Sequence, residues 1–142
     1  MQLGEVVAVS AALAGTRSRK AKTQMLAALL GATADLDELG VVVGFLTGEP
    51  RQGRFGIGWS TLAALDAPES DAPALTVRAV DEALADIAAT TGAGSAARRR
   101  DLLGVLLGQA TRDEQRFLGA LLTGELRQGA LEGVMVEAVA AA

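Results

Sequence analysis

A polar segment bracketed by glycines occurs twice in this chain, and it limits the possible folds more than any other feature. Residues 46–53 are Leu-Thr-Gly-Glu-Pro-Arg-Gln-Gly and residues 122–129 are Leu-Thr-Gly-Glu-Leu-Arg-Gln-Gly, so only Pro50 and Leu126 differ. A buried helix repeats the spacing of its apolar residues rather than its polar ones. The sequence therefore predicts two copies of one turn, and two copies of one contact.

The repeat extends upstream of the turn, which indicates an internal duplication. A shift of 77 residues aligns Gly15 with Gly92 and Ser18 with Ser95, and a shift of 76 then aligns the two turns. The 77-residue shift also aligns Leu26, Leu29, Leu30 and Gly31 with Leu103, Leu106, Leu107 and Gly108. We expect one domain over 1–142, with half-repeats at roughly 15–66 and 92–142. Residues 66–75, which hold Pro68 and Pro73, are the expected linker.

Apolar residues recur at helical spacing throughout, and no segment alternates as a strand would. We predict an all-α fold of about eight helices in two pseudo-symmetric halves. The expected helices cover 3–14, 18–31, 35–46, about 58–65, 76–90, a segment from 95, 111–123 and about 131–141. The expected N-caps are Ser18, Asp35, Thr76, Ser95 and Thr111. The expected inward faces include Leu3, Val6, Val9 and Leu13 in the first helix and Leu102, Leu103, Leu106 and Leu107 in the sixth.

Composition excludes several kinds of site. The 142 residues contain no Cys and no His, so disulfides, thiolate metal sites and a Ser-His-Asp triad are excluded. No apolar run approaches the roughly 18 residues that span a bilayer, and no secretory signal is recognised. We expect a cytoplasmic, monomeric protein that does not contact membranes.

Charge is segregated along the chain, although its net value is only −4, from 13 basic and 17 acidic residues. One basic run comprises Arg17, Arg19, Lys20 and Lys22, and another comprises Arg98, Arg99 and Arg100. Solvated helix starts would be the simplest explanation. Cations at a helix N-terminus are, however, mildly unfavourable against the helix dipole. Two such runs at related positions favour an anionic partner.

Internal two-fold symmetry suits duplex DNA, whose two strands are themselves related by local two-fold axes. Glycines let backbone amides approach phosphate, and arginines supply charge-assisted hydrogen bonds to it. Such contacts position a protein without reading base sequence. The predicted DNA contacts are Arg17, Arg19, Lys20, Lys22, Thr47, Gly48, Arg51, Gln52, Gly53, Gly56, Gly58, Ser95, Arg98, Arg99, Thr123, Gly124, Arg127, Gln128 and Gly129.

The chain resembles the N-terminal helical DNA-binding domain of ATP-dependent DNA ligases. The resemblance rests on four motifs that occur in order: Ala14-Gly15-Thr16-Arg17-Ser18-Arg19, Gly56-Ile57-Gly58, Gly92-Ala93-Gly94-Ser95 and Gly124-Glu125-Leu126-Arg127-Gln128-Gly129. The last is the most specific. Low Lys with high Ala and Arg usage resembles a bacterial, actinobacterial member.

The resemblance implies an all-α module that grips duplex DNA across the minor groove near a nick, in DNA repair, replication and recombination. It also implies that nucleotidyltransferase and OB-fold domains follow in a longer chain. ATP and Mg²⁺ would belong to that catalytic region, and no cofactor is expected here. The Lys-x-Asp-Gly motif is absent, since neither Lys20 nor Lys22 begins one. These residues alone are therefore not expected to ligate DNA.

Two other functions compete with this hypothesis. A helical protein-interaction module could use an acidic face, and it predicts that charge reversal at Asp81 and Glu82 matters more than loss of Arg127. A free-standing enzyme is disfavoured, because the capping carboxylates Asp37, Glu38, Asp113 and Glu114 form no convergent set. Trp59 is expected to pack at the domain edge rather than to stack on a base.

Overall fold

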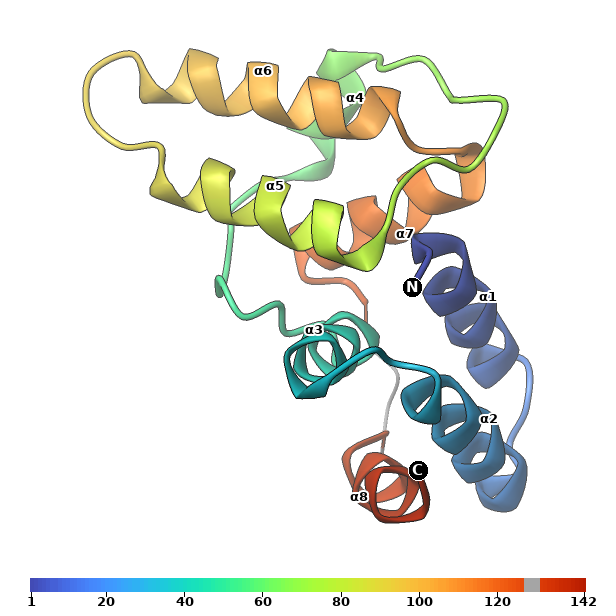
Figure 1. The fold of residues 1–142 in the computed structure, drawn as a ribbon. Helices are drawn as coiled ribbons and strands as arrows, with labels where there is room; N and C mark the ends of the chain where they lie inside the picture. The colour runs from blue at the N-terminus through green and yellow to red at the C-terminus, as the bar shows by residue number, and fades with distance from the viewer. Residues whose placement is uncertain (127–130) are drawn as a thin grey trace.

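The computed structural model describes residues 1–126 and 131–142, which form eight helices (Figure 1). The helices are α1 (Leu3–Ala14), α2 (Arg19–Gly31), α3 (Leu36–Thr47), α4 (Trp59–Leu65), α5 (Val77–Ala89), α6 (Ser95–Gly108), α7 (Arg112–Thr123) and α8 (Leu131–Ala141). No strand occurs in the part of the chain that the structure describes. The predicted all-α fold class is confirmed.

Polar caps begin most of the helices where the sequence predicts them. The side chains of Ser18, Asp35, Thr76 and Thr111 each accept a hydrogen bond from the backbone N–H three residues later. The prediction for α6 is wrong, because its N-cap is Gly94, with φ of 77°, and Ser95 is the first helical residue. Glycine adopts this left-handed conformation without the steric cost that a serine would carry.

Helices from the first half of the chain, α1 to α4, pack on helices from the second half, α5 to α8. Within each half, α1 packs on α2 and α5 packs on α6. Between halves, α1 packs on α7, α3 packs on α5 and α2 packs on α8. The pairs α3–α8 and α4–α7 are also in contact. The core is therefore shared between the halves (Figure 1).

The core is built mainly from leucine and valine, as the low aromatic content requires. Two predicted inward positions are wrong in detail. Val9 and Leu102 are only partly buried, and Ser10 takes the buried place on α1. Because 3.6 residues make one turn, Ser10 lies closer than Val9 to the stripe of Leu3, Val6 and Leu13.

The beginnings of α1 and α5 are joined directly. Gln2 and Thr76 form an isolated antiparallel bridge. The N–H of Leu3 donates to the carbonyl of Leu75 at 3.0 Å, and the N–H of Val77 donates to the carbonyl of Met1 at 2.9 Å. The linker end at Leu75 is therefore fixed against the first residues of the chain. None of the described helices is long and apolar enough to cross a membrane.

Candidate nucleic-acid interface

The two polar turns begin with the same backbone geometry. Gly48 ends α3 with φ of 79° and ψ of 16°, and Gly124 ends α7 with φ of 77° and ψ of 13°. The Thr47 hydroxyl donates to the Val43 carbonyl at 2.8 Å, and the Thr123 hydroxyl donates to the Gly119 carbonyl at 2.8 Å. The duplicated sequence therefore forms a duplicated helix end. Both hydroxyl groups donate to their own helix and keep only acceptor capacity for a ligand.

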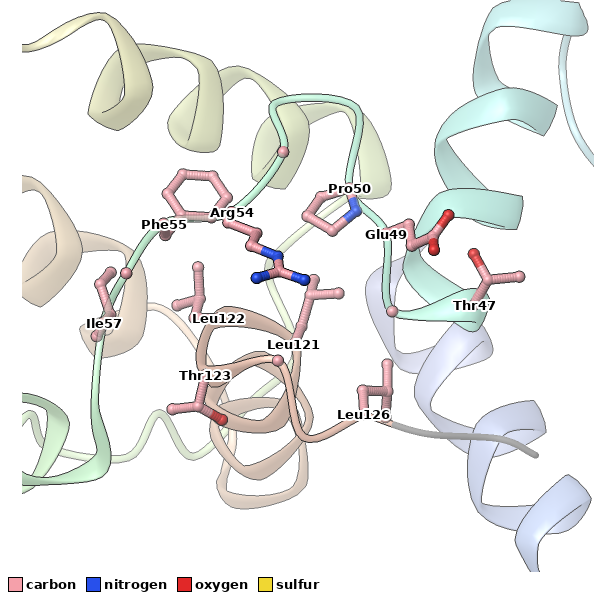
Figure 2. Close-up of a pocket in the computed structure, with 14 residues that line it drawn as sticks. Thr47, Glu49, Pro50, Arg54, Phe55, Ile57, Leu121, Leu122, Thr123 and Leu126 are labelled. Carbon is pink, nitrogen blue, oxygen red and sulfur yellow. The ribbon is translucent and has the colours of Figure 1, made fainter.

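Both turns line one cavity of about 780 Å³ (Figure 2). The first turn contributes Thr47 to Pro50, and the second contributes Thr123, Gly124 and Leu126. The turns also touch, because a Cβ atom at Gly48 would collide with the carbonyl oxygen of Leu126. Segments 76 residues apart in the sequence are thus adjacent in the structure.

The one position at which the repeated turns differ is an apolar contact. Pro50 is buried and Leu126 is partly buried, and both line the cavity. The Leu126 N–H donates to the Ala120 carbonyl at 3.0 Å. Pro50 has no N–H and cannot make the equivalent bond. The two turns therefore differ in backbone pairing as well as in side chain.

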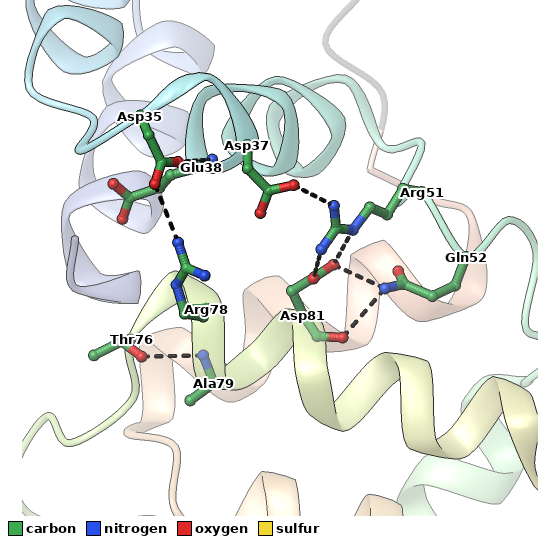
Figure 3. A network of polar contacts seen from close by, with 9 residues as sticks. All are labelled: Asp35, Asp37, Glu38, Arg51, Gln52, Thr76, Arg78, Ala79 and Asp81. Carbon is green, nitrogen blue, oxygen red and sulfur yellow. Dashed lines mark hydrogen bonds and ion pairs between the residues drawn. The ribbon is translucent and has the colours of Figure 1, made fainter.

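Arg51 and Gln52 of the first turn are bound to carboxylates of the protein itself (Figure 3). The Arg51 guanidinium pairs with both carboxylate oxygens of Asp81 and with Asp37 Oδ1 at 2.8 Å. Gln52 Nε2 donates to Asp81 Oδ1 at 2.8 Å. The hydrogen bonds that Arg51 donates, first to Asp81 and then to Asp37, raise the pKa of Arg51. The first Arg-Gln pair thus fastens α5 to the end of α3, while half of the Arg51 side chain stays exposed.

The Asp81 carboxylate lies inside this network rather than on an acidic surface. Asp81 is 4% exposed. The expectation that Asp81 and Glu82 present an acidic face to a partner is therefore wrong for Asp81. Its carboxylate forms an ion pair with Arg51 and accepts a hydrogen bond from Gln52.

The two basic runs lie at opposite ends of the view in Figure 1, α2 beginning at the lower right and α6 at the upper left. On α2, Arg19 pairs with Glu137 of α8 at 2.7 Å, which raises the pKa of Arg19 and lowers that of Glu137. Neighbouring Arg17 and Lys20 are exposed, and Lys22 is partly buried. The two runs therefore form no single cluster.

The start of α6 is attached to the segment that follows the first turn. Arg99 Nη2 donates to the Phe55 carbonyl at 3.4 Å, and Phe55 lines the cavity between the turns. Arg98 is exposed beside Asp86 and Thr90 in a separate hollow. Ser95 is partly buried in the first turn of α6. Of this basic run, Arg99 is thus the residue that approaches the cavity.

Residues 53–57 of the glycine-rich segment 53–58 form one wall of the cavity. Gly53 and Gly56 have φ of 85° and 64°, and Gly58 is the N-cap of α4. Arg54 lies between the two glycines and points into the cavity between the turns (Figure 2). The sequence predictions did not include Arg54, because its partner under the 76-residue shift is Ala130 and the repeat match had ended. Its position directly after Gly53 is the signal that could have found it.

Trp59 packs on α7, in agreement with the prediction that it packs against the protein at the domain edge. A Cβ atom at Gly119 would lie 2.9 Å from the Trp59 ring, so the ring occupies the space that the glycine leaves. Trp59 remains 46% exposed. It lies at the edge of the domain.

Three predicted contacts, Arg127, Gln128 and Gly129, lie outside the described residues. Within residues 1–126 and 131–142, no group of three His, Cys, Asp or Glu residues could hold a metal ion.

The fold and the cavity define an internally duplicated, all-α domain whose two equivalent turns meet at one site. A comparison with known families identifies it further. Residues 65–140 match the family described as DNA ligase N terminus, which is more than half of the chain. The chain belongs to this family.

Several relatives are similar over the whole chain. A probable DNA ligase of Saccharopolyspora erythraea is 52% identical over 140 residues, covering 99% of this chain and 27% of the relative. Probable DNA ligases of Rhodococcus opacus and Anaeromyxobacter dehalogenans are 49% identical over 142 residues and 52% identical over 145 residues. Each match covers 100% of this chain and 28% of the relative. The chain thus spans just over a quarter of their length.

Proposed function

We propose that this domain binds duplex DNA without sequence preference, as the DNA-binding part of an ATP-dependent DNA ligase. The observation that carries the proposal is the meeting of the two duplicated turns at one cavity, with the start of α6 attached to its wall. Glycines at the cavity allow backbone to approach phosphate closely, and a duplicated site suits the two strands of a duplex. Membership of the DNA ligase N-terminus family supports the same reading.

The two turns contribute unequally in this proposal. Arg51 and Gln52 are engaged by Asp81, so the first turn offers a ligand its backbone and the exposed part of Arg51. Arg127 and Gln128 of the second turn remain predicted contacts from the sequence resemblance. The exposed cations Arg17, Lys20 and Arg98 add attraction to the phosphate backbone over a wider surface.

In the longer chain, nucleotidyltransferase and OB-fold domains would supply catalysis, with ATP and Mg²⁺. The domain described here would hold the nicked duplex in a fixed position relative to them. Its role in repair, replication and recombination in the cytoplasm would be this positioning. The residues present act by hydrogen bonding and charge, and no bond-making step is assigned to them.

The test is binding of a fluorescein-labelled nicked duplex, measured by anisotropy over a range of NaCl concentrations. Log affinity should fall linearly with log salt, by about 0.9 per phosphate neutralised. Arg127→Ala should weaken binding equally for duplexes of unrelated sequence and flatten this slope by about 0.9. Absence of duplex binding at low salt, or binding that is insensitive to salt, would refute the proposal.

A further inference from the structure

We propose that the cavity between the two turns is a site for a single phosphate group, and that Arg54 is the side chain that binds it. The inference rests on the proposed function, which supplies the ligand as a phosphate of the DNA backbone. It adds the place on the protein and the residue that carries the charge. That residue lies outside the repeated sequence.

The charge balance of the cavity singles out Arg54. Among the fourteen residues that line it, Arg54 is the cation and Glu49 is the anion. Arg54 is exposed, and it forms no hydrogen bond or ion pair with any residue in 1–126 or 131–142. The Glu49 carboxylate points away from the Arg54 guanidinium (Figure 2). The guanidinium is therefore free to pair with an anion.

Arg51, the arginine that the repeat predicts, is placed differently. It faces α5, where Asp81 and Asp37 hold it, and it does not line the cavity (Figure 3). A phosphate that bound Arg51 would compete with two carboxylates that are already in place. No described carboxylate competes for Arg54. In the first half, Arg54 is therefore the arginine that binds phosphate, the role that the sequence predicted for Arg51.

Backbone N–H groups without a described partner occur in the same wall of the cavity. The N–H groups of Arg54, Gly56 and Ile57 make no hydrogen bond within the described residues, and all three residues line the cavity. Positive φ at Gly53 and Gly56 turns the chain sharply on either side of Arg54. Successive amides in such a turn form a concave anion site. A guanidinium beside free amides provides the charge-assisted hydrogen bonds that a tetrahedral oxyanion requires.

The ligand is thus a phosphate oxyanion, and the two possible sources are a DNA backbone and free phosphate. The structure favours DNA, because the cavity opens between turns from both halves and is not an enclosed pocket for one small ion. Arg99, which contacts the Phe55 carbonyl, adds a second cation next to the site. A polyanion can engage both arginines at once, whereas a single phosphate engages one.

The decisive variant is Arg54→Gln in the 142-residue chain, with Arg112→Gln as the matched control. Arg112 is also exposed and without a described partner, and it lies at the opposite end of α7 from Thr123. Both variants change the charge equally. With the labelled nicked duplex, Arg54→Gln should weaken binding about tenfold and flatten the salt slope by about 0.9. Arg112→Gln should change neither by more than about a third of that effect.

A third variant, Glu49→Gln, should act in the opposite direction, because it removes the anion from the same cavity. The variant should bind the duplex about twofold more tightly, because the Glu49 carboxylate no longer repels the phosphate. Equal behaviour of Arg54→Gln and Arg112→Gln would overturn the proposal. A weaker complex for Glu49→Gln would do so as well.

Titration with inorganic phosphate, followed by backbone amide NMR, separates the two sources of phosphate. Weak shifts at Arg54, Gly56 and Ile57 that disappear in Arg54→Gln support the site, provided that the duplex binds there more tightly. Saturation by millimolar phosphate without an Arg54 effect on duplex binding would refute DNA as the source. If the unaltered chain bound no duplex at all, the proposed function would fail, and the phosphate titration would still test the site itself.

Discussion

The turn after α3 and the turn after α7 have the same backbone but different surroundings. Gly48 and Gly124 differ by only a few degrees in φ and ψ, and Thr47 and Thr123 make the same hydrogen bonds. Yet a Cβ atom at Gly48 would meet the Leu126 carbonyl, whereas a Cβ atom at Gly124 would meet no atom of residues 1–126 or 131–142 within 4 Å. The local sequence sets the shape of each turn, and the neighbouring elements set what that turn does.

The difference extends to the helix that faces each turn. The bridge between Gln2 and Thr76 relates α1 to α5 by a shift of 74 residues, and this shift aligns Asp81 with Val7. The carboxylate that holds Arg51 and Gln52 therefore has no counterpart on α1. Duplication kept the turns and changed the residues opposite them. The Arg-Gln pair of the first turn therefore links the end of α3 to α5.

The largest expected difference between the two turns is the loss of stability when each glycine is replaced by alanine. Gly48→Ala should destabilise the fold by about 3 kcal/mol, because it combines left-handed strain with a collision against the Leu126 carbonyl. Gly124→Ala has the same left-handed strain but no collision with a described residue, and it should cost about 1 kcal/mol. Urea unfolding of both variants measures the difference. Equal midpoints would mean that the two turns are not in contact.

The next effect compares the buried glutamates near the starts of α3 and α7. Glu38 Oε1 accepts from the Met1 ammonium at 2.7 Å and Oε2 accepts from the Ala34 N–H. Glu114 Oε1 accepts from the Thr111 N–H at 2.8 Å, and its Oε2 has no hydrogen-bond partner in the described structure. Glu38→Gln should cost about 2 kcal/mol, whereas Glu114→Gln should cost less than about 0.5 kcal/mol.

The ion pair of Glu38 also makes the stability of the fold depend on pH. The Met1 ammonium, and then the Ala34 N–H, lowers the pKa of Glu38 in the folded protein. A lowered folded pKa stabilises the fold above the ordinary carboxyl value of about 4.3, and that stabilisation is lost as pH falls through the folded pKa. The gap between the unaltered protein and Glu38→Gln, measured by urea unfolding, should therefore shrink below about pH 4. A gap that stays constant down to about pH 2 would exclude this ion pair as its cause.

The smallest effect sharpens the assignment of the first turn. Asp81→Ala removes the acceptor of Gln52 and the main partner of Arg51, and it should cost about 1 kcal/mol of stability. Duplex binding should not weaken, and its salt slope should steepen by up to about 0.9 if the released Arg51 gains a phosphate. Glu82→Ala is the matched control, since Glu82 is an exposed acid on the same helix. Weaker binding by Asp81→Ala alone would mean that its network shapes the DNA site.

Local patterns predicted most of the fold. The caps at Ser18, Asp35, Thr76 and Thr111 and the glycine ends of α3 and α7 follow from short-range chemistry, so the sequence places them within a residue or so. Ser95 was the exception, because a glycine before it satisfies the left-handed N-cap position better than a serine. Apolar spacing located the core, apart from borderline positions such as Val9 and Leu102.

The site was less predictable, because it depends on contacts between residues far apart in the sequence. The repeat correctly indicated that the turns are equivalent, and the structure brings them to one cavity. It could not indicate that Asp81, some 30 residues away, would engage Arg51 and Gln52. The sequence did not predict Arg54, because the repeat aligns it with Ala130 and not with a second arginine. Whether the predicted residues contact DNA stays a prediction for the binding measurements above.

The packing of helices from one half on helices from the other has a consequence for cleavage of the chain. Because α1 lies on α7 and α3 lies on α5, each half covers apolar surface that belongs to the other. Neither half can bury its own core alone. A chain cut within residues 66–75 should therefore remain a two-fragment complex that unfolds in one transition, as fragments do in complementation. Two independent domains on a tether would separate instead, and that outcome would contradict the single domain predicted for residues 1–142.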